Sequence, residues 1–339
     1  MRSWEENAKF GPHLERIAAV PLKSVGPFVY RDGFVYAGAR HGNDPQVTVI
    51  DARKPAEPRV VGSLPFKRSI LSMALSGERL LVGESQRALH IYDLQDPAAP
   101  KYLDCVVSLG KDICAVDTLG ELAAAGLNWG GVGLMDLKTL RWVSEQRLEE
   151  GFVEELCVAQ GLIFAAGASG GLVVFRAEGG KLEEVARPCG SGFNASEVFP
   201  MGSQVWVAGA RKNKPELVVI DPRAPDRVVH RLSTKISTPR SLRATRSGVG
   251  LGFFTHYTCA QYDPAGGTSG MLFRQYLGDE DQRYYEMSEA RAQERGGPRM
   301  TCMDTISQME VVGKTLIAAQ GEAITVYRIL PGSAFEECL

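Results

Sequence analysis

The sequence predicts an all-β fold, a single seven-bladed β-propeller that spans residues 1–339 as one domain. Three observations predict it. A short apolar strand recurs along the chain, a second apolar strand follows each recurrence, and the composition favours strands and turns. The 37 glycines and 18 prolines suit many short strands joined by tight turns, and the 44% hydrophobic content is enough for a substantial core.

The first strand series is apolar, and most of its members end in glycine. Its seven end positions are Gly38, Gly83, Gly126, Gly167, Gly209, Gly252 and Gln320. Five of the six spacings fit the period of roughly 40–45 residues that is expected when each repeat is one four-stranded blade. The last spacing is longer, which indicates an insertion between blades six and seven.

The second strand series follows the first in every repeat. Its members are rich in β-branched and aromatic residues and are too short for helices: 47–51, 89–93, 133–136, 172–175, 217–221, 259–263 and 324–327. Nearly continuous apolar character is typical of strands that are buried on both faces, as occurs when blades stack face to face. A closed ring of blades leaves only short strand edges exposed.

Two repeats carry a recognisable motif. The run VIDARKPAEPRVVG at 49–62 resembles the LVIVD repeat, in which a strand ending in Asp precedes spaced prolines. The run IYDLQDPAAP at 91–100 matches it again, and VIDPRAP at 219–225 matches it in part. The other blades lack the prolines and are similar to a generic WD-repeat-like pattern. The resemblance implies a propeller fold and assigns no active-site residue. LVIVD-repeat proteins are typically exported or surface proteins.

Two segments lie outside the regular repeat. Residues 16–23 resemble the outer strand at 59–67, and the chain after residue 329 is too short for another clear strand. We therefore predict that residues 14–20 close the last blade by pairing with residues 324–329. Residues 278–298 are predicted to form a helical insertion, because Asp279 and Gln282 suit a helix start and Gly296-Gly297-Pro298 a stop.

Charge and cysteine content indicate the cellular compartment of the protein and the classes of partner that it does not bind. A net charge of −2 provides no bulk attraction to nucleic acid, and no apolar run approaches the roughly 20 residues that a membrane span needs. The N-terminus carries acidic residues where a secretory signal needs an apolar run. The seven cysteines are odd in number and have no paired spacing, which favours reduced thiols. We expect a cytoplasmic protein that does not bind nucleic acid and does not insert into a membrane.

No motif supports catalysis. Residues 167–171 (GASGG) fit the G-x-S-x-G pattern of serine hydrolases, but that motif requires a strand-to-helix turn and here joins two predicted strands. The five histidines lack metal-ligand spacing, and His256 with Cys259 has no second pair. The sequence therefore predicts a protein that is not an enzyme and that holds no cofactor.

Three carboxylates leave an alternative open. Glu154, Glu155 and Glu197 fall in the predicted innermost strands of blades four and five, close to the propeller channel. They are candidate channel carboxylates for Ca²⁺ binding or for a metal-dependent, lactonase-like hydrolysis. They also suit ion pairs with Arg240, at the equivalent position of blade six, because buried acids usually have a basic partner.

A candidate partner-binding face comes from loops of different blades that converge if the ring closes. Arginine and exposed aromatic residues are favoured at binding faces because they combine contact area with donors. The candidates are Arg40, His41, Trp129, Phe152, Phe193, Arg211, Lys212, His256 and Tyr257. The leading interpretation is a protein–protein interaction scaffold or a subunit of a larger assembly. A binder of small anionic or sugar ligands is a further alternative.

Overall fold

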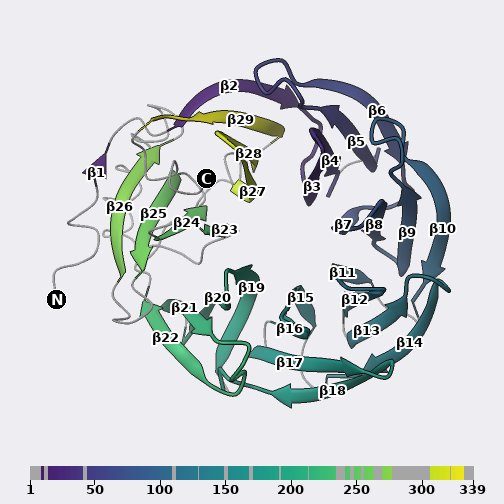
Figure 1. The fold of residues 1–339 in the computed structure, drawn as a ribbon, viewed down its shortest axis with the longest axis vertical. Coiled ribbons are helices and arrows are strands. Elements are labelled where there is room, and N and C mark those ends of the chain that lie inside the picture. Colours follow the sequence, from purple (N-terminus) through teal and green to yellow (C-terminus); the bar gives the residue numbers. More distant parts are fainter. Residues whose placement is uncertain are drawn as a thin grey trace, which may run out of the picture. The chain divides into compact units, whose positions relative to one another are not determined.

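The computed structural model describes residues 9–10, 14–40, 44–108, 112–128, 130–148, 152–167, 171–190, 192–212, 214–233, 241–244, 248–252, 256–262, 269–276, 306–320 and 322–331. The chain divides into two compact units. We call Lys23–Thr238 the central unit, and Met1–Leu22 together with Pro239–Leu339 the terminal unit. Figure 1 numbers the strands in chain order.

Five four-stranded antiparallel sheets form the central unit, one for each of five consecutive repeats. Blade one contains β3 (Phe28–Arg31), β4 (Phe34–Gly38), β5 (Gln46–Asp51) and β6 (Arg59–Pro65). Blade two contains β7 (Ile70–Ser76), β8 (Arg79–Glu84), β9 (Ala88–Asp93) and β10 (Lys101–Val107). Blade three contains β11 (Ile113–Leu119), β12 (Leu122–Leu127), β13 (Gly131–Asp136) and β14 (Arg141–Gln146).

Blades four and five have the same order. Blade four contains β15 (Val153–Ala159), β16 (Leu162–Gly167), β17 (Gly171–Glu178) and β18 (Lys181–Ala186). Blade five contains β19 (Phe193–Met201), β20 (Gln204–Arg211), β21 (Lys214–Ile220) and β22 (Val228–Ser233). Every blade of the central unit is therefore a β-meander. Figure 1 shows its first strand innermost and its fourth strand outermost.

The terminal unit contains two sheets. One joins β2 (Leu14–Pro21), β29 (Ala323–Ile329), β28 (Thr315–Gln320) and β27 (Ile306–Val312) in that spatial order. The other joins β1 (Lys9–Phe10), β26 (Ser269–Tyr276), β25 (His256–Tyr262), β24 (Gly248–Gly252) and β23 (Ser241–Ala244). All neighbours are antiparallel except β1 and β26, which pair in parallel.

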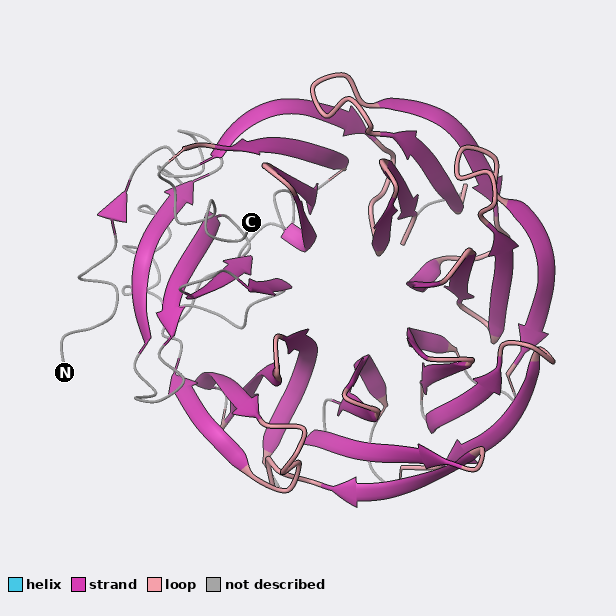
Figure 2. Ribbon diagram, viewed as in Figure 1, coloured by secondary structure: helices cyan, strands magenta, loops and turns pink. Residues whose placement is uncertain are grey.

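The predicted number of regular blades is corrected by the structure. The sequence predicts seven four-stranded blades, whereas six sheets of the described chain have four strands. The repeat that ends at Gly252 forms the five-stranded sheet instead, because β1 adds to β26. No helix occurs in the described ranges (Figure 2), and the helical insertion predicted at 278–298 lies outside the described residues.

The predicted closing strand is confirmed within the terminal unit. Strand β2 pairs antiparallel with β29, with Leu14 opposite Ile329 and Pro21 opposite Ala323. The Arg328 guanidinium donates a hydrogen bond of 2.6 Å to Oε2 of Glu15 across this pair. The N-terminal segment thus supplies the outer strand of the last four-stranded sheet, because the chain after β29 offers no other strand in the described residues.

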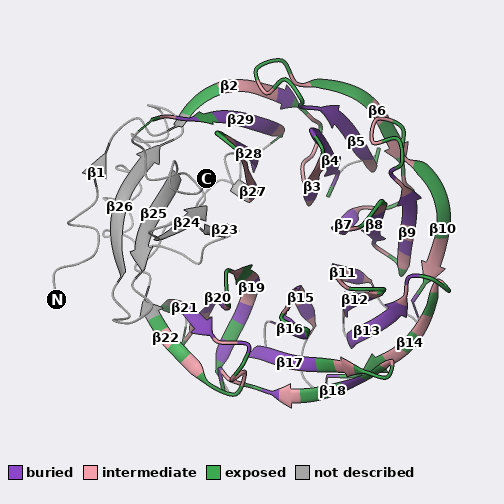
Figure 3. Ribbon diagram, viewed as in Figure 1, coloured by how far each residue is buried: buried purple, intermediate pink, exposed green. Residues whose placement is uncertain are grey.

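Burial follows the order of strands within a blade. The second and third strands are almost wholly buried, and the fourth strands are mostly exposed (Figure 3). The core clusters join side chains of consecutive blades, as when Phe164 and Val174 of blade four pack with Val205 and Val218 of blade five. Blades therefore stack face to face, which explains the continuous apolar runs of the sequence.

Two of the glycines that mark the repeat, Gly38 and Gly126, lie where the next blade approaches closely. A Cβ atom added at Gly38 would lie 2.7 Å from Cγ2 of Ile70, in blade two. One added at Gly126 would lie 2.5 Å from Cγ1 of Val153, in blade four. Real Cβ atoms do not tolerate such distances, so a larger residue would force the innermost strand of the next blade to shift.

Every outermost strand of the central unit has a β-bulge at the same place. The extra residue is always apolar: Val61, Leu103, Val143, Val185 and Val229. A bulge interrupts the hydrogen-bond ladder and twists the strand, so that the free edge is a poor template for another chain. The bulges also account for exposed apolar side chains on these strands, of which Val143 is 44% exposed.

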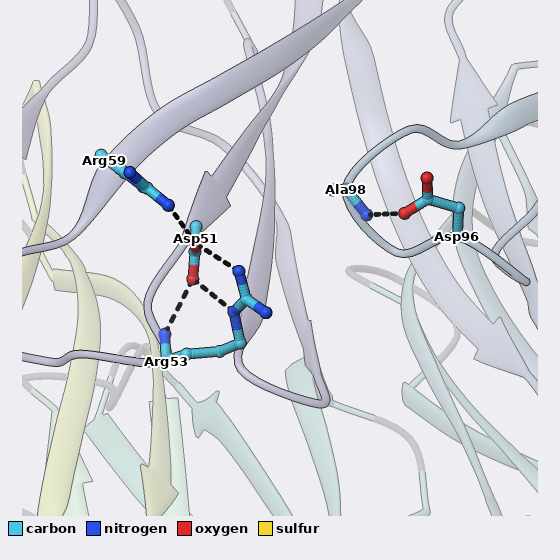
Figure 4. Close-up of polar contacts among 5 residues, drawn as sticks. All are labelled: Asp51, Arg53, Arg59, Asp96 and Ala98. Atoms are coloured by element: carbon cyan, nitrogen blue, oxygen red, sulfur yellow. Dashed lines mark hydrogen bonds and ion pairs between the residues drawn. The ribbon is translucent and has the colours of Figure 1, made fainter.

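A repeated turn explains the aspartate of the sequence motif. In four blades the aspartate near the end of the third strand accepts, through Oδ1, the backbone N–H two residues later at 2.8–3.2 Å: Asp51, Asp93, Asp136 and Asp221. In blade one, Arg53 and Arg59 also donate to the buried Asp51 (Figure 4). The hydrogen bond from the Arg53 side chain is the main reason that the pKa of Asp51 lies well below its usual range.

Candidate interaction face

The strand order gives each blade of the central unit two opposite ends. Because strands of a meander alternate in direction, turns between first and second strands share one end with turns between third and fourth strands. We call this end the turn face, and it includes the strand residues next to the turns and residues 32–33, 77–78, 120–121, 160–161, 202–203, 52–58, 94–100, 137–140, 179–180 and 221–227. We call the other end the loop face, and its described residues are 39–40, 44–45, 66–69, 85–87, 108, 112, 128, 130, 147–148, 152, 187–190, 192 and 212.

Polar side chains of the turn face connect neighbouring blades. The Arg31 guanidinium donates to the Gly77 carbonyl, which joins blade one to blade two. The Arg79 guanidinium donates to the Leu137 carbonyl, which joins blade two to blade three. Gln160 Nε2 donates to the Ser203 carbonyl at 3.1 Å, between blades four and five. The polar groups of this face therefore stabilise the stacking of blades.

The loop face is supported by a buried acid, Glu84. Its Oε1 atom accepts the backbone N–H groups of Lys67 and Arg68 at 2.8 and 2.7 Å. Its Oε2 atom lies 2.9 Å from Nε2 of His90, whose ring packs edge-on against Phe66 with centroids 5.0 Å apart. Glu84 is 6% exposed, so all these partners satisfy a carboxylate that has little contact with water.

A second acid, Asp112, holds the neighbouring turn of blade two. Gln86 and Arg87 both have positive φ angles, 67° and 86°, and residues other than glycine adopt such angles only with backbone strain. Asp112 Oδ1 accepts the Gln86 N–H at 2.5 Å, and the Ser108 N–H donates to the Arg87 carbonyl at 2.7 Å. These contacts from the next connecting segment fix the strained turn.

Exposed cations lie on the segments that Glu84 and Asp112 hold. Lys67, Arg68 and Arg87 are exposed, and none of them forms an ion pair with a described residue. Arg40 is also exposed. Burial raises the pKa values of Glu155 and Cys114 in the innermost strands, and the positive charge of Arg40 offsets a part of this rise. The loop face of blades one and two thus presents four exposed cations, of which Arg40 lies close enough to the innermost strands to act on their acidic groups.

The candidate residues of blade five do not all lie at the surface. Phe193 was predicted as an exposed aromatic, and this is wrong: it is 1% exposed and belongs to the core between blades four and five. The Arg211 guanidinium lies over the Phe193 ring, 5.7 Å from its centroid, and donates to the Cys189 carbonyl at 2.7 Å. Arg211 also pairs with Glu216 at 3.5 Å. Much of its hydrogen-bonding capacity is therefore used within blade five.

The other candidates are only partly described. Lys212 is exposed in a turn with a φ of 49°, and Phe152 is half-buried on the segment before β15. His41 and Trp129 lie outside the described residues. His256 and Tyr257 belong to β25 of the terminal unit, where only the backbone is described. Of the predicted candidates, Arg40 and Lys212 are therefore exposed and Phe193 is not, while the surface positions of Trp129 and Tyr257 are untested.

The channel carboxylates occupy equivalent positions of neighbouring blades. Glu155 of β15 and Glu197 of β19 each follow a bulge residue near the loop-face end of the innermost strand. The pKa of Glu155 is raised to about 7. Burial is the main cause of this rise, and the negative charges of Asp117 and Glu154 contribute to it. Asp117 itself accepts the backbone N–H groups of Thr118 and Val158, both at 2.7 Å, which links blade three to blade four.

The arrangement of acidic groups does not favour a metal centre in the described residues. Among them, no group of three or more His, Cys, Asp or Glu side chains is placed to hold a metal ion. Arg240, the expected partner of these carboxylates, lies outside the described residues. In the same part of the chain, no helix is long and apolar enough to cross a membrane.

Sequence reasoning missed the buried acid that supports the loop face. Glu84 belongs to no motif, although its place next to a strand-ending glycine puts it beside the blade connection. His90 was considered only as one of five histidines without metal-ligand spacing, yet it contacts Glu84. The pairing of residues 84 and 88 around a short turn is the local signal, but the partner segment at 67–68 is visible only in the fold.

Comparisons with known proteins agree with the strand topology. No family model matches the sequence and no curated protein matches it, so the resemblance to the LVIVD repeat is not confirmed. A chain in a crystal structure of the mitotic checkpoint complex is similar in fold, with a TM-score of 0.70, 11% identity and coverage of 95% of this chain and 93% of that chain. A crystal structure of the computationally designed Ika8 protein is similar with a TM-score of 0.60, 10% identity and coverage of 93% and 98%. At such identities the similarity shows the fold alone, which is a β-propeller.

Proposed function

We propose that this β-propeller is a non-catalytic protein-interaction scaffold, or a subunit of a larger assembly, that binds its partner on the loop face. The observation that carries the proposal is a difference in how the two faces use their cationic side chains. On the turn face, arginines are used in blade-to-blade hydrogen bonds. On the loop face, Lys67, Arg68 and Arg87 are exposed without an ion pair to a described residue.

Two further points support this function. Similarity to a chain from a structure of a protein complex is compatible with a role in assembly, although at 11% identity it shows the fold alone. Proteins with this surface pattern gain affinity from exposed arginines that lie on a rigid support. We further propose that the motif-bearing blades one and two belong to the LVIVD type and that the protein acts in the cytoplasm.

Lysine cross-linking tests the proposal, because each face carries its own lysines. The tagged protein is purified from its native source with its partner, cross-linked, and analysed by mass spectrometry. We expect cross-links to the partner from Lys67 and Lys212 on the loop face, and none from Lys54 and Lys138 on the turn face. Cross-links confined to the turn face would overturn the proposal, as would turnover of a lactone by the purified protein that is abolished by Glu155→Gln.

A further inference from the structure

We propose that the loop face of blades one and two binds a carboxylate-rich segment of a partner protein, through Lys67, Arg68 and Arg87. This inference rests on the proposed scaffold function and names the chemistry of the segment that the face recognises. It concerns these three exposed cations and excludes Arg40, which offsets a part of the rise that burial causes in the pKa of Glu155.

Backbone hydrogen bonds bring these cations to one place. The Ile70 N–H donates to the Ala39 carbonyl at 3.0 Å, and the Ser85 N–H donates to the Ser69 carbonyl at 2.9 Å. The connection that carries Lys67 and Arg68 therefore lies between residue 39 and the turn that carries Arg87. All three cationic side chains are exposed on this joined surface.

The acids of the same region form no ion pair with these cations. Glu84 is buried, accepts two backbone N–H groups and contacts His90. Asp112 accepts the Gln86 N–H, and the exposed Asp44 pairs with Lys23 at 2.9 Å. The three cations outnumber the carboxylates of Glu84 and Asp112, so the region is net positive on a chain whose net charge is −2, which favours a ligand with several negative groups.

The turn at Arg87 provides an independent observation. Hairpin-turn positions with positive φ angles favour Asn and Gly, yet this three-residue turn has Gln86 and Arg87 at 67° and 86°. Strained residues of this kind persist only where surrounding contacts fix them, and they concentrate at functional sites. Here the contacts from Asp112 and Ser108 fix the turn, and the strain places an arginine beside Lys67 and Arg68.

Two loops contribute the three cations, so an extended peptide with spaced carboxylates fits better than one compact anion. Arg68 and Arg87 offer planar guanidinium groups, which suit carboxylates because both can form two parallel hydrogen bonds. The field accelerates association, and its screening predicts an affinity that falls as the salt concentration rises.

Fluorescence anisotropy of a defined peptide tests the inference. The probe is a labelled peptide in which Glu alternates with Ser, and the reference probe has Gln in place of Glu. We expect the wild-type protein to bind the Glu peptide alone. Lys67→Glu/Arg68→Glu/Arg87→Glu should weaken binding by at least about tenfold at low salt. Lys54→Glu/Lys138→Glu/Lys181→Glu makes the same change in charge on the turn face and should alter binding by less than about twofold.

Three results would overturn the inference. The first is an equal loss of affinity for the Glu peptide in the two charge-reversed variants. The second is equal binding of the Glu and Gln peptides by the wild-type protein. The third is binding of a labelled single-stranded RNA that is tighter than binding of the Glu peptide. If reversal unfolds the protein, Lys67→Gln/Arg68→Gln/Arg87→Gly replaces it, with thermal melting as the check. Failure here is distinguishable from failure of the scaffold function. If the peptide does not bind while the partner still cross-links to Lys67, only the inference is wrong.

Discussion

Arginine residues have different roles on the two faces of the central unit. Arg79 of the turn face is half-buried and donates to the Leu137 carbonyl of the next blade. Arg87 of the loop face is exposed, and the contacts that it makes within the fold are through its backbone. The comparison teaches that the count of arginines on a propeller face says little by itself. A stabilising face differs from a binding face in whether the guanidinium groups are already hydrogen-bonded within the fold or remain available to a partner.

The largest expected effect comes from breaking the support of the loop face. Glu84→Ala removes the acceptor of two backbone N–H groups and the partner of His90 in a site that is 6% exposed. Unsatisfied buried donors are costly, so the free energy of unfolding should fall by about 2–4 kcal/mol. Urea denaturation measures this change.

A matched substitution sharpens this prediction. Glu84→Gln keeps one acceptor oxygen and should cost less than half as much as the alanine variant. If both substitutions left the unfolding free energy within about 0.5 kcal/mol of wild type, the carboxylate would not support the face.

The second effect is a pH dependence at the inner ends of the blades, near the loop face. Burial raises the pKa of Glu155 to about 7, above its value in the unfolded chain. A raised pKa in the folded state means that the stabilising contribution is present below the unfolded pKa of about 4.5 and is lost as pH rises through about 7.

Glu155→Gln should remove this dependence. We expect the variant to be more stable than wild type at pH 8, by on the order of 2 kcal/mol, and close to wild type at pH 5. Thermal or urea unfolding across this range measures the difference. Parallel stability curves of the two proteins would show that Glu155 ionises in the folded protein as it does in water.

The third prediction compares one cation from each face. Arg79→Ala removes a hydrogen bond between blades and should lower the free energy of unfolding by about 1–2 kcal/mol. Lys67→Ala removes an exposed side chain without an ion pair in the described residues and should change it by less than about 0.5 kcal/mol. Equal costs would erase the distinction between the faces.

Sequence reasoning was strongest where one physical requirement recurs in several blades. Some of the spaced glycines follow from the close approach of the next blade, as at Gly126 and Val153. The aspartate turns follow from a local hydrogen bond two residues away, as at Asp51. The closing strand at 14–20 was predictable because residues 16–23 resemble the outer strand at 59–67 and little chain follows residue 329.

It was weakest where the outcome depends on contacts between segments far apart in the sequence. Phe193 begins an innermost strand, and nothing local shows that the ring turns into the core rather than outward. Likewise, the fifth strand that β1 adds to its sheet requires a pairing with residues 273–274, far along the chain. Both errors concern long-range placement, which strand patterns do not encode.

The smallest expected effect separates strain from function on the loop face. Gln86→Gly and Arg87→Gly each place glycine at a positive φ angle, where a side chain costs about 1–2 kcal/mol. Glycine also loses about 0.5–1 kcal/mol through the greater freedom of the unfolded chain. Each variant should therefore gain about 0.5–1 kcal/mol in the free energy of unfolding.

Only one of the two glycine variants should lose function. Arg87→Gly removes a proposed carboxylate-binding side chain and should weaken binding of the Glu peptide, while Gln86→Gly should leave it unchanged. Denaturation and anisotropy on the same preparations measure both properties. A protein that retains a less stable turn in order to present Arg87 would show higher stability and lower affinity in a single substitution. If Arg87→Gly bound the peptide as well as wild type, the strain would have no connection with binding, and the positive field of the face would have to arise from Lys67 and Arg68 alone.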